Sequence, residues 1–175
     1  MLQKYDKIKS SLLLAFAAAG GAVITGTATA AEATCSLDNG YAIELASYVA
    51  EATTCVTEAS NFDAEIADAL VAKIHAERAA NGLAPLNRRA SLDMAAKSHA
   101  LDMATRIYAD HVDMEGRDHL HRIRAFDRTM LVGASGSNVT VSLATADAQA
   151  VHEKIKMDAF NADNILRSSF TDVGI

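Results

Sequence analysis

The first thirty residues place the strongest constraint on the fold of this chain, because they have the pattern of an export signal. A basic start at Lys4 to Lys9 is followed by an uncharged, mostly apolar run from Ser11 to Gly26. Ala28 and Ala30 then supply the small residues that signal peptidases read. We expect a signal peptide over residues 1–30, cleaved after Ala30, and a secreted or periplasmic protein. The alternative is an uncleaved anchor, although the run is shorter than the roughly 20 residues that a membrane-spanning helix needs. No transmembrane segment is expected after cleavage.

Export changes the interpretation of the two cysteines, Cys35 and Cys55. In an oxidising compartment such a pair typically forms a disulfide, and closing a loop of this length stabilises a fold by about 3 kcal/mol. We therefore predict a disulfide-clipped extension over residues 31–60, with a short helix between Tyr41 and Ala52. Two free buried thiols are the alternative. A zinc site is not indicated, because two cysteines without a nearby histidine provide too few ligands.

The remainder, residues 61–175, contains neither an internal repeat nor a linker and reads as one domain. The formal net charge is −6 and no basic run occurs, so we expect no nucleic-acid partner. Apolar residues recur at helical spacing, with Asn61 or Asp63 as the first N-cap and Ser91 as the second. The predicted elements are helices over 61–82, 91–108, 118–128 and 144–157, a strand over 138–143, a turn at 164–166 and a β-rich end from 170 to 175.

Several motifs then resemble one family in order and spacing. Ile74 to Leu86, which ends Gly82-Leu83-Ala84-Pro85-Leu86, is similar to the family pattern N-x-x-R-x-x-x-G-L-x-P-L. His99 to Ala104 is similar to H-A-x-D-M-A, and Tyr108 to His111 is similar to F/Y-x-S-H. Asn164-Ile165-Leu166 and Val173-Gly174 are similar to the late motifs N-I-L and V-G. These residues resemble the bacterial CAP superfamily (SCP-like; cysteine-rich secretory, antigen five and pathogenesis-related proteins).

The resemblance implies an α+β fold, a helix-rich three-layer α-β-α sandwich. The chain ends at Ile175, where the family continues through one or two more strands, so we expect the last strand or strands to be missing. The resemblance also implies a cleft with two histidines and two acidic residues that hold a divalent cation. Here His111 takes the first histidine position, Ser137 replaces a glutamate, and Asn161 replaces the second histidine. The groove candidates are therefore His111, Ser137, Asn138 and Asn161.

A second metal hypothesis is local to the polar stretch from Asp110 to His121. His111, His119, His121, Asp113 and Glu115 are its candidate ligands for a divalent cation. His119 and His121 face one ion only if the segment is extended, since on a helix they point about 200° apart. A solvated polar loop is the alternative interpretation.

Nucleophilic catalysis has no motif support, because the Gly-x-Ser-x-Gly elbow is absent from the sequence and Gly136-Ser137 resembles an ordinary turn. We therefore expect a secreted binding domain at the cell envelope or outside the cell, without a cofactor and not a competent enzyme. Its partner would be a lipid, a small apolar ligand or an envelope or extracellular protein. The alternatives are a metal-dependent hydrolase built on His111 and the acidic loop Asp110 to Glu115, and a decayed gene product.

Overall fold

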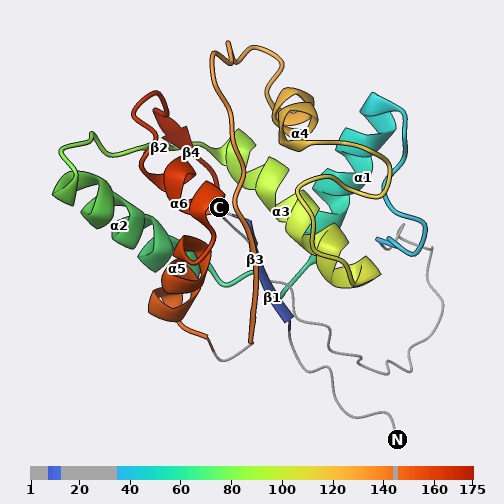
Figure 1. The fold of residues 1–175 in the computed structure, drawn as a ribbon. Helices are drawn as coiled ribbons and strands as arrows, with labels where there is room; N and C mark the ends of the chain where they lie inside the picture. The colour runs from blue at the N-terminus through green and yellow to red at the C-terminus, as the bar shows by residue number, and fades with distance from the viewer. Residues whose placement is uncertain (1–7, 13–34, 144–145) are drawn as a thin grey trace, which may run out of the picture.

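The computed structural model describes residues 8–12, 35–143 and 146–175. It shows an α+β fold in which helices predominate (Figure 1). The helices are α1 (Leu45–Glu58), α2 (Ala64–Ala80), α3 (Ala90–Arg106), α4 (His119–Phe126), α5 (Ala148–Lys156) and α6 (Ala159–Ile165). The strands are β1 (Ile8–Leu12), β2 (Asn87–Arg88), β3 (Val139–Leu143) and β4 (Asp172–Val173).

The strands form two short pairs between two groups of helices. β1 and β3 are antiparallel, with Ile8 opposite Leu143 and Leu12 opposite Val139, whereas β2 and β4 are parallel. Figure 1 shows α1, α3 and α4 on one side of β1 and β3, and α2, α5 and α6 on the other. The arrangement agrees with the expected layered fold. Apart from β1, the predicted signal peptide lies outside the described residues, and its cleavage stays a prediction.

The predicted helices are present, and most of them begin at an acidic N-cap. The side chains of Asp63, Asp118 and Asp147 accept backbone N–H bonds at the starts of α2, α4 and α5. The second cap was predicted wrongly. Arg89 occupies the N-cap of α3 without a side-chain bond, while the Ser91 hydroxyl instead donates to Asp127, 36 residues away. A partner distant in sequence thus replaced the local capping bond.

The end of the chain differs more from the sequence-based prediction. Of residues 164–166, which were expected to form a turn, 164 and 165 are the end of α6 and Leu166 is its C-cap; the helix begins after an N-cap at Asp158. β2 was not predicted, because two residues are too few to show an alternating pattern. The predicted β-rich end is confirmed as β4.

Two apolar clusters fill the space between the layers. The larger joins α2, α3, α5 and the chain end, and includes Leu70, Ile74, Val151, Ile155 and Ile175, each 0–1% exposed. The smaller joins α1 to α3 and α4.

Cys35 and Cys55 form a disulfide beside the smaller cluster, as predicted. Tyr48, on α1, is 1% exposed within that cluster. The 35–58 segment is therefore part of the packed molecule.

The last residues are fixed by an unusually close approach to α3. A Cβ atom at Gly174 would lie 2.1 Å from the carbonyl carbon of Leu92, so only glycine allows β4 to run there. Arg78, 1% exposed, donates to the carbonyl oxygens of Ala84 and Ile165 at 2.8 Å each and also to those of Arg167 and Phe170. These contacts position the C-terminal wall of the cavity described below.

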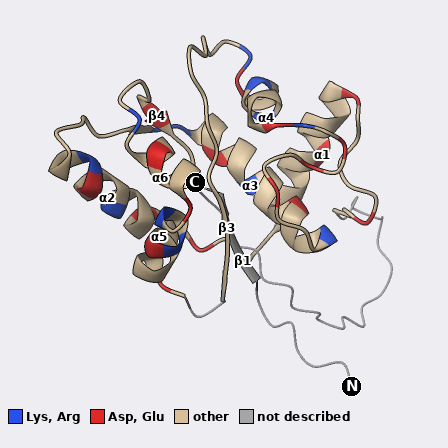
Figure 2. Ribbon diagram, viewed as in Figure 1, with Lys and Arg blue, Asp and Glu red and all other residues tan. Residues whose placement is uncertain are grey.

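Surface charges are mixed in sign. Figure 2 shows Lys and Arg beside Asp and Glu on α2 and α5, unlike the continuous basic face that phosphate contacts require. Among the helices that the structure describes, none combines the length and apolar character needed to cross a bilayer.

Candidate functional site

A cavity of about 610 Å³ opens between α3, α4, the 127–137 loop and the chain end. Its apolar lining comes from segments far apart in the sequence and includes Leu92, Ile123, Met130, Val132, Ile165 and Phe170. Its polar lining includes the charged residues Arg89, Arg122, Asp127 and Asp172 as well as His119, Ser135, Ser137 and Asn164. A concave site that combines apolar walls with polar groups is typical of small-molecule binding.

Two serine–histidine pairs lie at the polar part of the lining, to which Ser135, His119 and Ser137 belong and His111 does not. Nδ1 of His111 lies 2.8 Å from Oγ of Ser137, and Nε2 of His119 lies 3.1 Å from Oγ of Ser135. Both pairs join the segment that follows α3 to the 133–138 loop. Burial lowers the pKa of His119, which favours its neutral form. A neutral imidazole at position 119 therefore shares a hydrogen bond with a hydroxyl group at this wall.

Three buried asparagines hold the loop behind Ser137. Asn138, which is 0% exposed, donates to the carbonyl oxygen of Asn161 at 2.9 Å. Asn164 donates from one nitrogen to the carbonyl oxygen of Ser137 at 3.2 Å and to Oδ1 of Asn138 at 2.9 Å. Oδ1 of Asn164 is buried and accepts no hydrogen bond within the described residues. The loop is thus anchored by side chains on α6.

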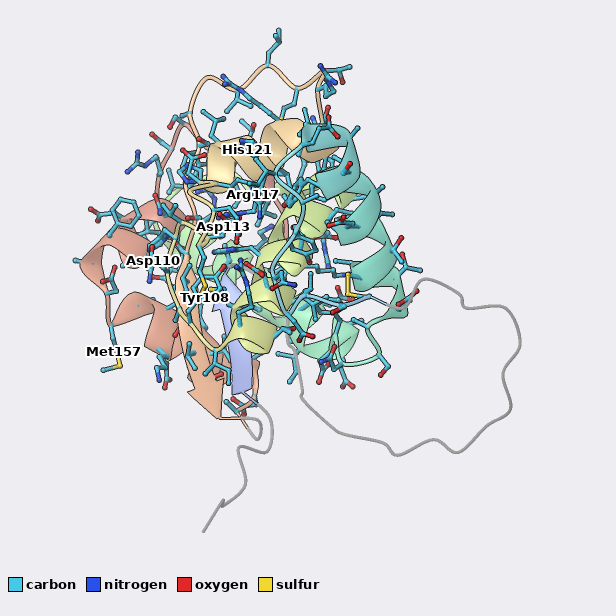
Figure 3. The ribbon with its side chains drawn as sticks, turned by 90° about the vertical axis from the view of Figure 1, so that its right-hand side faces the viewer. Tyr108, Asp110, Asp113, Arg117, His121 and Met157 are labelled. Carbon is cyan, nitrogen blue, oxygen red and sulfur yellow. A yellow bond between two sulfur atoms is a disulfide. The ribbon has the colours of Figure 1, made fainter. Side chains whose placement is uncertain are left out.

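A second polar cluster lies at the C-terminal end of α3. Ligand atoms of Asp102, Asp113 and Glu115 lie within 4.8 Å of one another. Arg106 binds Asp102 through Nε and Nη2 at 2.7 Å each, and Glu115 through Nη1 and Nη2 at 2.6 and 2.7 Å. Arg117 binds Asp113 through Nε at 2.6 Å and Glu115 through Nη2 at 2.9 Å. Figure 3 shows Asp113 and Arg117 next to each other beneath α4.

These ion pairs argue for a structural role of the cluster. The two guanidinium groups bind the carboxylates that a cation would need, and buried charges are tolerated when they are paired and hydrogen-bonded in this way. Hydrogen bonds from Arg106 to Glu115 and Asp102 raise the pKa of Arg106. Burial and the hydrogen bond to Asp102 raise the pKa of the Tyr108 hydroxyl, which keeps it protonated.

The comparisons with known proteins bear on this arrangement. The family model "CAP: Cysteine-rich secretory protein family" matches residues 71–175. The chain belongs to the CAP family. No curated protein matches it, and no solved structure does. The match covers α3, the two serine–histidine pairs and the C-terminal wall of the cavity.

In this CAP domain the four groove candidates lie near one another. His111 and Ser137 share a hydrogen bond, and Asn138 follows Ser137 and contacts Asn161. The Asn161 side chain also donates to the carbonyl oxygen of Val139 at 3.2 Å. Their part in ligand binding stays a prediction.

The local metal candidates are split between different surroundings. Asp113 and Glu115 join Asp102 in the ion-paired cluster, whereas His119 contacts Ser135. The ring of His121 packs edge-on against Tyr48, with centroids 6.2 Å apart. Both histidines lie in the first turn of α4 and point to different partners, as helical geometry requires.

The CAP cleft described by the resemblance also lacks a fitting donor set for a cation. Within residues 35–143 and 146–175, His111 belongs to no group of three His, Cys, Asp or Glu whose ligand atoms converge. Its ring shares a hydrogen bond with the hydroxyl of Ser137, a weaker cation ligand than the glutamate of the family pattern. The side chains around His111 therefore do not fit a divalent cation.

One feature of the site could not be predicted from single motifs. The pairing of His111 with Ser137 joins residues 26 positions apart. The only available signal was that both residues fall on cleft positions of the CAP pattern. His99, the first residue of the H-A-x-D-M-A match, is packed and hydrogen-bonded: it is 1% exposed and donates from Nε2 to the carbonyl oxygen of Asp110 at 2.8 Å.

Proposed function

We propose that this CAP domain is a secreted binding protein that takes a small, largely apolar ligand into the cavity beside α4. The single observation that carries the proposal is the cavity itself. Its volume of about 610 Å³ falls within the range of roughly 300–1,000 Å³ that is usual for small-molecule sites.

The chemistry of the walls supports an amphipathic ligand. The apolar walls favour a hydrocarbon body, because moving it out of water is favourable in proportion to its area. The polar side offers the hydroxyl groups of Ser135 and Ser137, and Asn164 carries a buried carbonyl oxygen without a partner among the described residues. A lipid or similar molecule with one polar end fits a cavity that has both apolar walls and a polar side.

Two further observations support a role outside the cytoplasm, at the envelope or beyond it. The cysteines form a disulfide, which is typical of proteins folded in oxidising compartments. The N-terminal residues have the pattern of an export signal. An envelope or extracellular protein as partner is the other outcome that the binding experiment below distinguishes.

The test is a fluorescence titration of the protein with a dansyl-labelled fatty acid. Ala134 lines the cavity from the exposed loop, so Ala134→Trp should fill part of it and weaken binding by about tenfold or more, equivalent to about 1.4 kcal/mol. Ala80→Trp, on the exposed end of α2 and away from the cavity, is the matched control and should bind like wild type.

Circular dichroism must show that both variants fold. Saturable binding by wild type that Ala134→Trp leaves unchanged would place the ligand elsewhere. Absence of saturable binding by folded wild type would contradict an apolar ligand and favour a protein partner.

A further inference from the structure

Chemistry at the cavity wall can be inferred from the pair formed by Ser137 and His111. Ser137 lines the cavity and is 5% exposed, and its Oγ lies 2.8 Å from Nδ1 of His111. A hydroxyl within hydrogen-bond distance of a histidine provides the nucleophile and the base of an activated serine, which in many enzymes a third group orients further. Ser137 is a lining residue of a cavity large enough for a substrate, whereas His111 is not a lining residue and contacts the Ser137 hydroxyl.

The backbone around Ser137 is held firmly. Its carbonyl oxygen accepts a hydrogen bond from Asn164, and the following residue, Asn138, is completely buried. A Cβ atom at the preceding Gly136 would lie 2.8 Å from Oδ1 of Asn164, so the loop approaches α6 as closely as glycine allows. The position of the Ser137 hydroxyl is therefore set by its surroundings, as precise nucleophile placement demands.

One neighbour packs against the ring of His111, and another holds its backbone. Its ring packs edge-on against Phe160, with centroids 5.8 Å apart and planes at 83°. Its carbonyl oxygen accepts a hydrogen bond from Nη2 of Arg122 at 2.8 Å. In the tautomer that carries its proton on Nε2, Nδ1 accepts the hydrogen bond from Ser137 and is ready to take the proton.

Donors for a developing negative charge are also present. The backbone N–H groups of Gly136 and Ser137 donate no hydrogen bond within the part of the chain that the structure describes. In serine hydrolases the nucleophile's own N–H group helps to bind the oxyanion. The N–H group of Ser137 is available to bind an oxyanion in the same way.

We propose that Ser137 accepts the acyl group of a carboxylic ester whose apolar part occupies the cavity. Its Oγ attacks the ester carbonyl carbon while His111 takes the hydroxyl proton at Nδ1. The bond to the leaving alcohol then breaks, and the alkoxide receives that proton. The acyl group remains on Ser137 until water, deprotonated by His111, releases the acid. This inference rests on the proposed binding role, because the cavity must admit the ester, but it assigns a reaction as well.

The experiment uses the full chain, an alkyl fluorophosphonate and p-nitrophenyl butyrate, with intact-mass spectrometry and p-nitrophenol release as readouts. Wild type should gain one phosphonyl group, and peptide mapping should place it on Ser137. Ser137→Ala should not react. Ser168→Ala, an exposed serine outside the cavity wall, should react like wild type. His111→Gln should slow labelling by about 100-fold, the usual contribution of a general base.

The proposal fails if folded wild type is not labelled, or if Ser137→Ala is labelled at the wild-type rate. Binding of the dansyl-labelled fatty acid separates this failure from failure of the proposed function. Wild type that binds the fatty acid but remains unlabelled retains the binding role and loses the acyl-transfer step. Wild type that shows neither loses both.

Discussion

His99 gives the sharpest prediction, because the structure buries it in its neutral form. It is 1% exposed, and burial, followed by the nearby charge of Arg122, lowers its pKa from 6.5 to about 3. The hydrogen bond to the carbonyl oxygen of Asp110 and the charge of Asp113 act in the opposite direction without compensating. Folding therefore favours the uncharged ring, whereas the unfolded chain protonates it near pH 6.5.

The sign of the effect follows from proton linkage. Below pH 6.5 the unfolded state binds more protons than the folded state, so stability is fully present above pH 6.5 and is lost as the pH falls toward 3. A shift from 6.5 to about 3 predicts a loss of about 2 kcal/mol between about pH 7.5 and pH 5 from this residue alone. His119 and His152, whose pKa values burial also lowers, add to the total slope.

The measurement compares wild type with His99→Gln, which cannot titrate. Urea unfolding is followed by far-ultraviolet circular dichroism, since the chain has no tryptophan. The variant is expected to be less stable at about pH 7.5 and to show a shallower decline toward about pH 5. Because other groups titrate in both proteins, the difference in slope belongs to His99. Parallel declines in the two proteins would refute the burial argument.

Three further predictions concern the rest of the fold. Replacing Cys35 and Cys55 by serine should cost about 3 kcal/mol of unfolding free energy, and an unchanged unfolding midpoint would contradict a stabilising disulfide. Gly136→Ala should cost about 1–3 kcal/mol because its Cβ would lie 2.8 Å from Oδ1 of Asn164, whereas Gly133→Ala, with open space around it, should cost far less; equal losses would exclude the packing argument. Zn²⁺, Mg²⁺ and Ca²⁺ should leave the thermal unfolding midpoint unchanged, and a saturable rise would show a cation site that the ion-paired carboxylates do not suggest.

Apart from α6, the helices could be predicted because local chemistry determines them. The apolar stripe of α2 and the capping aspartates at 63, 118 and 147 are visible within a few residues of sequence. Where a side chain was used over a longer distance, local reasoning was wrong. Ser91 pairs with Asp127 and does not cap α3, and Arg78 binds carbonyl groups up to 92 residues away.

The site was only partly predictable for the same reason. The family pattern directed attention to His111, Ser137 and Asn161, but no spacing rule indicates which hydroxyl would meet which imidazole. The acidic residues near His111 were grouped with it because they are close in sequence. In the structure, Asp113 and Glu115 turn toward Arg106 and Arg117, since buried carboxylates require strong donors.

Arg117 gives the N-terminal extension a significance that its sequence does not suggest. Besides its two acidic partners, its guanidinium donates to the carbonyl oxygen of Ala42 at 2.9 Å and lies 4.7 Å from the ring centre of Tyr48. A recombinant fragment beginning at residue 61 would therefore lose the contacts that Ala42 and Tyr48 make with Arg117. It would expose one face of an arginine whose charge is balanced inside the molecule, and anyone trimming the chain for crystallisation should keep the segment from Cys35 onward.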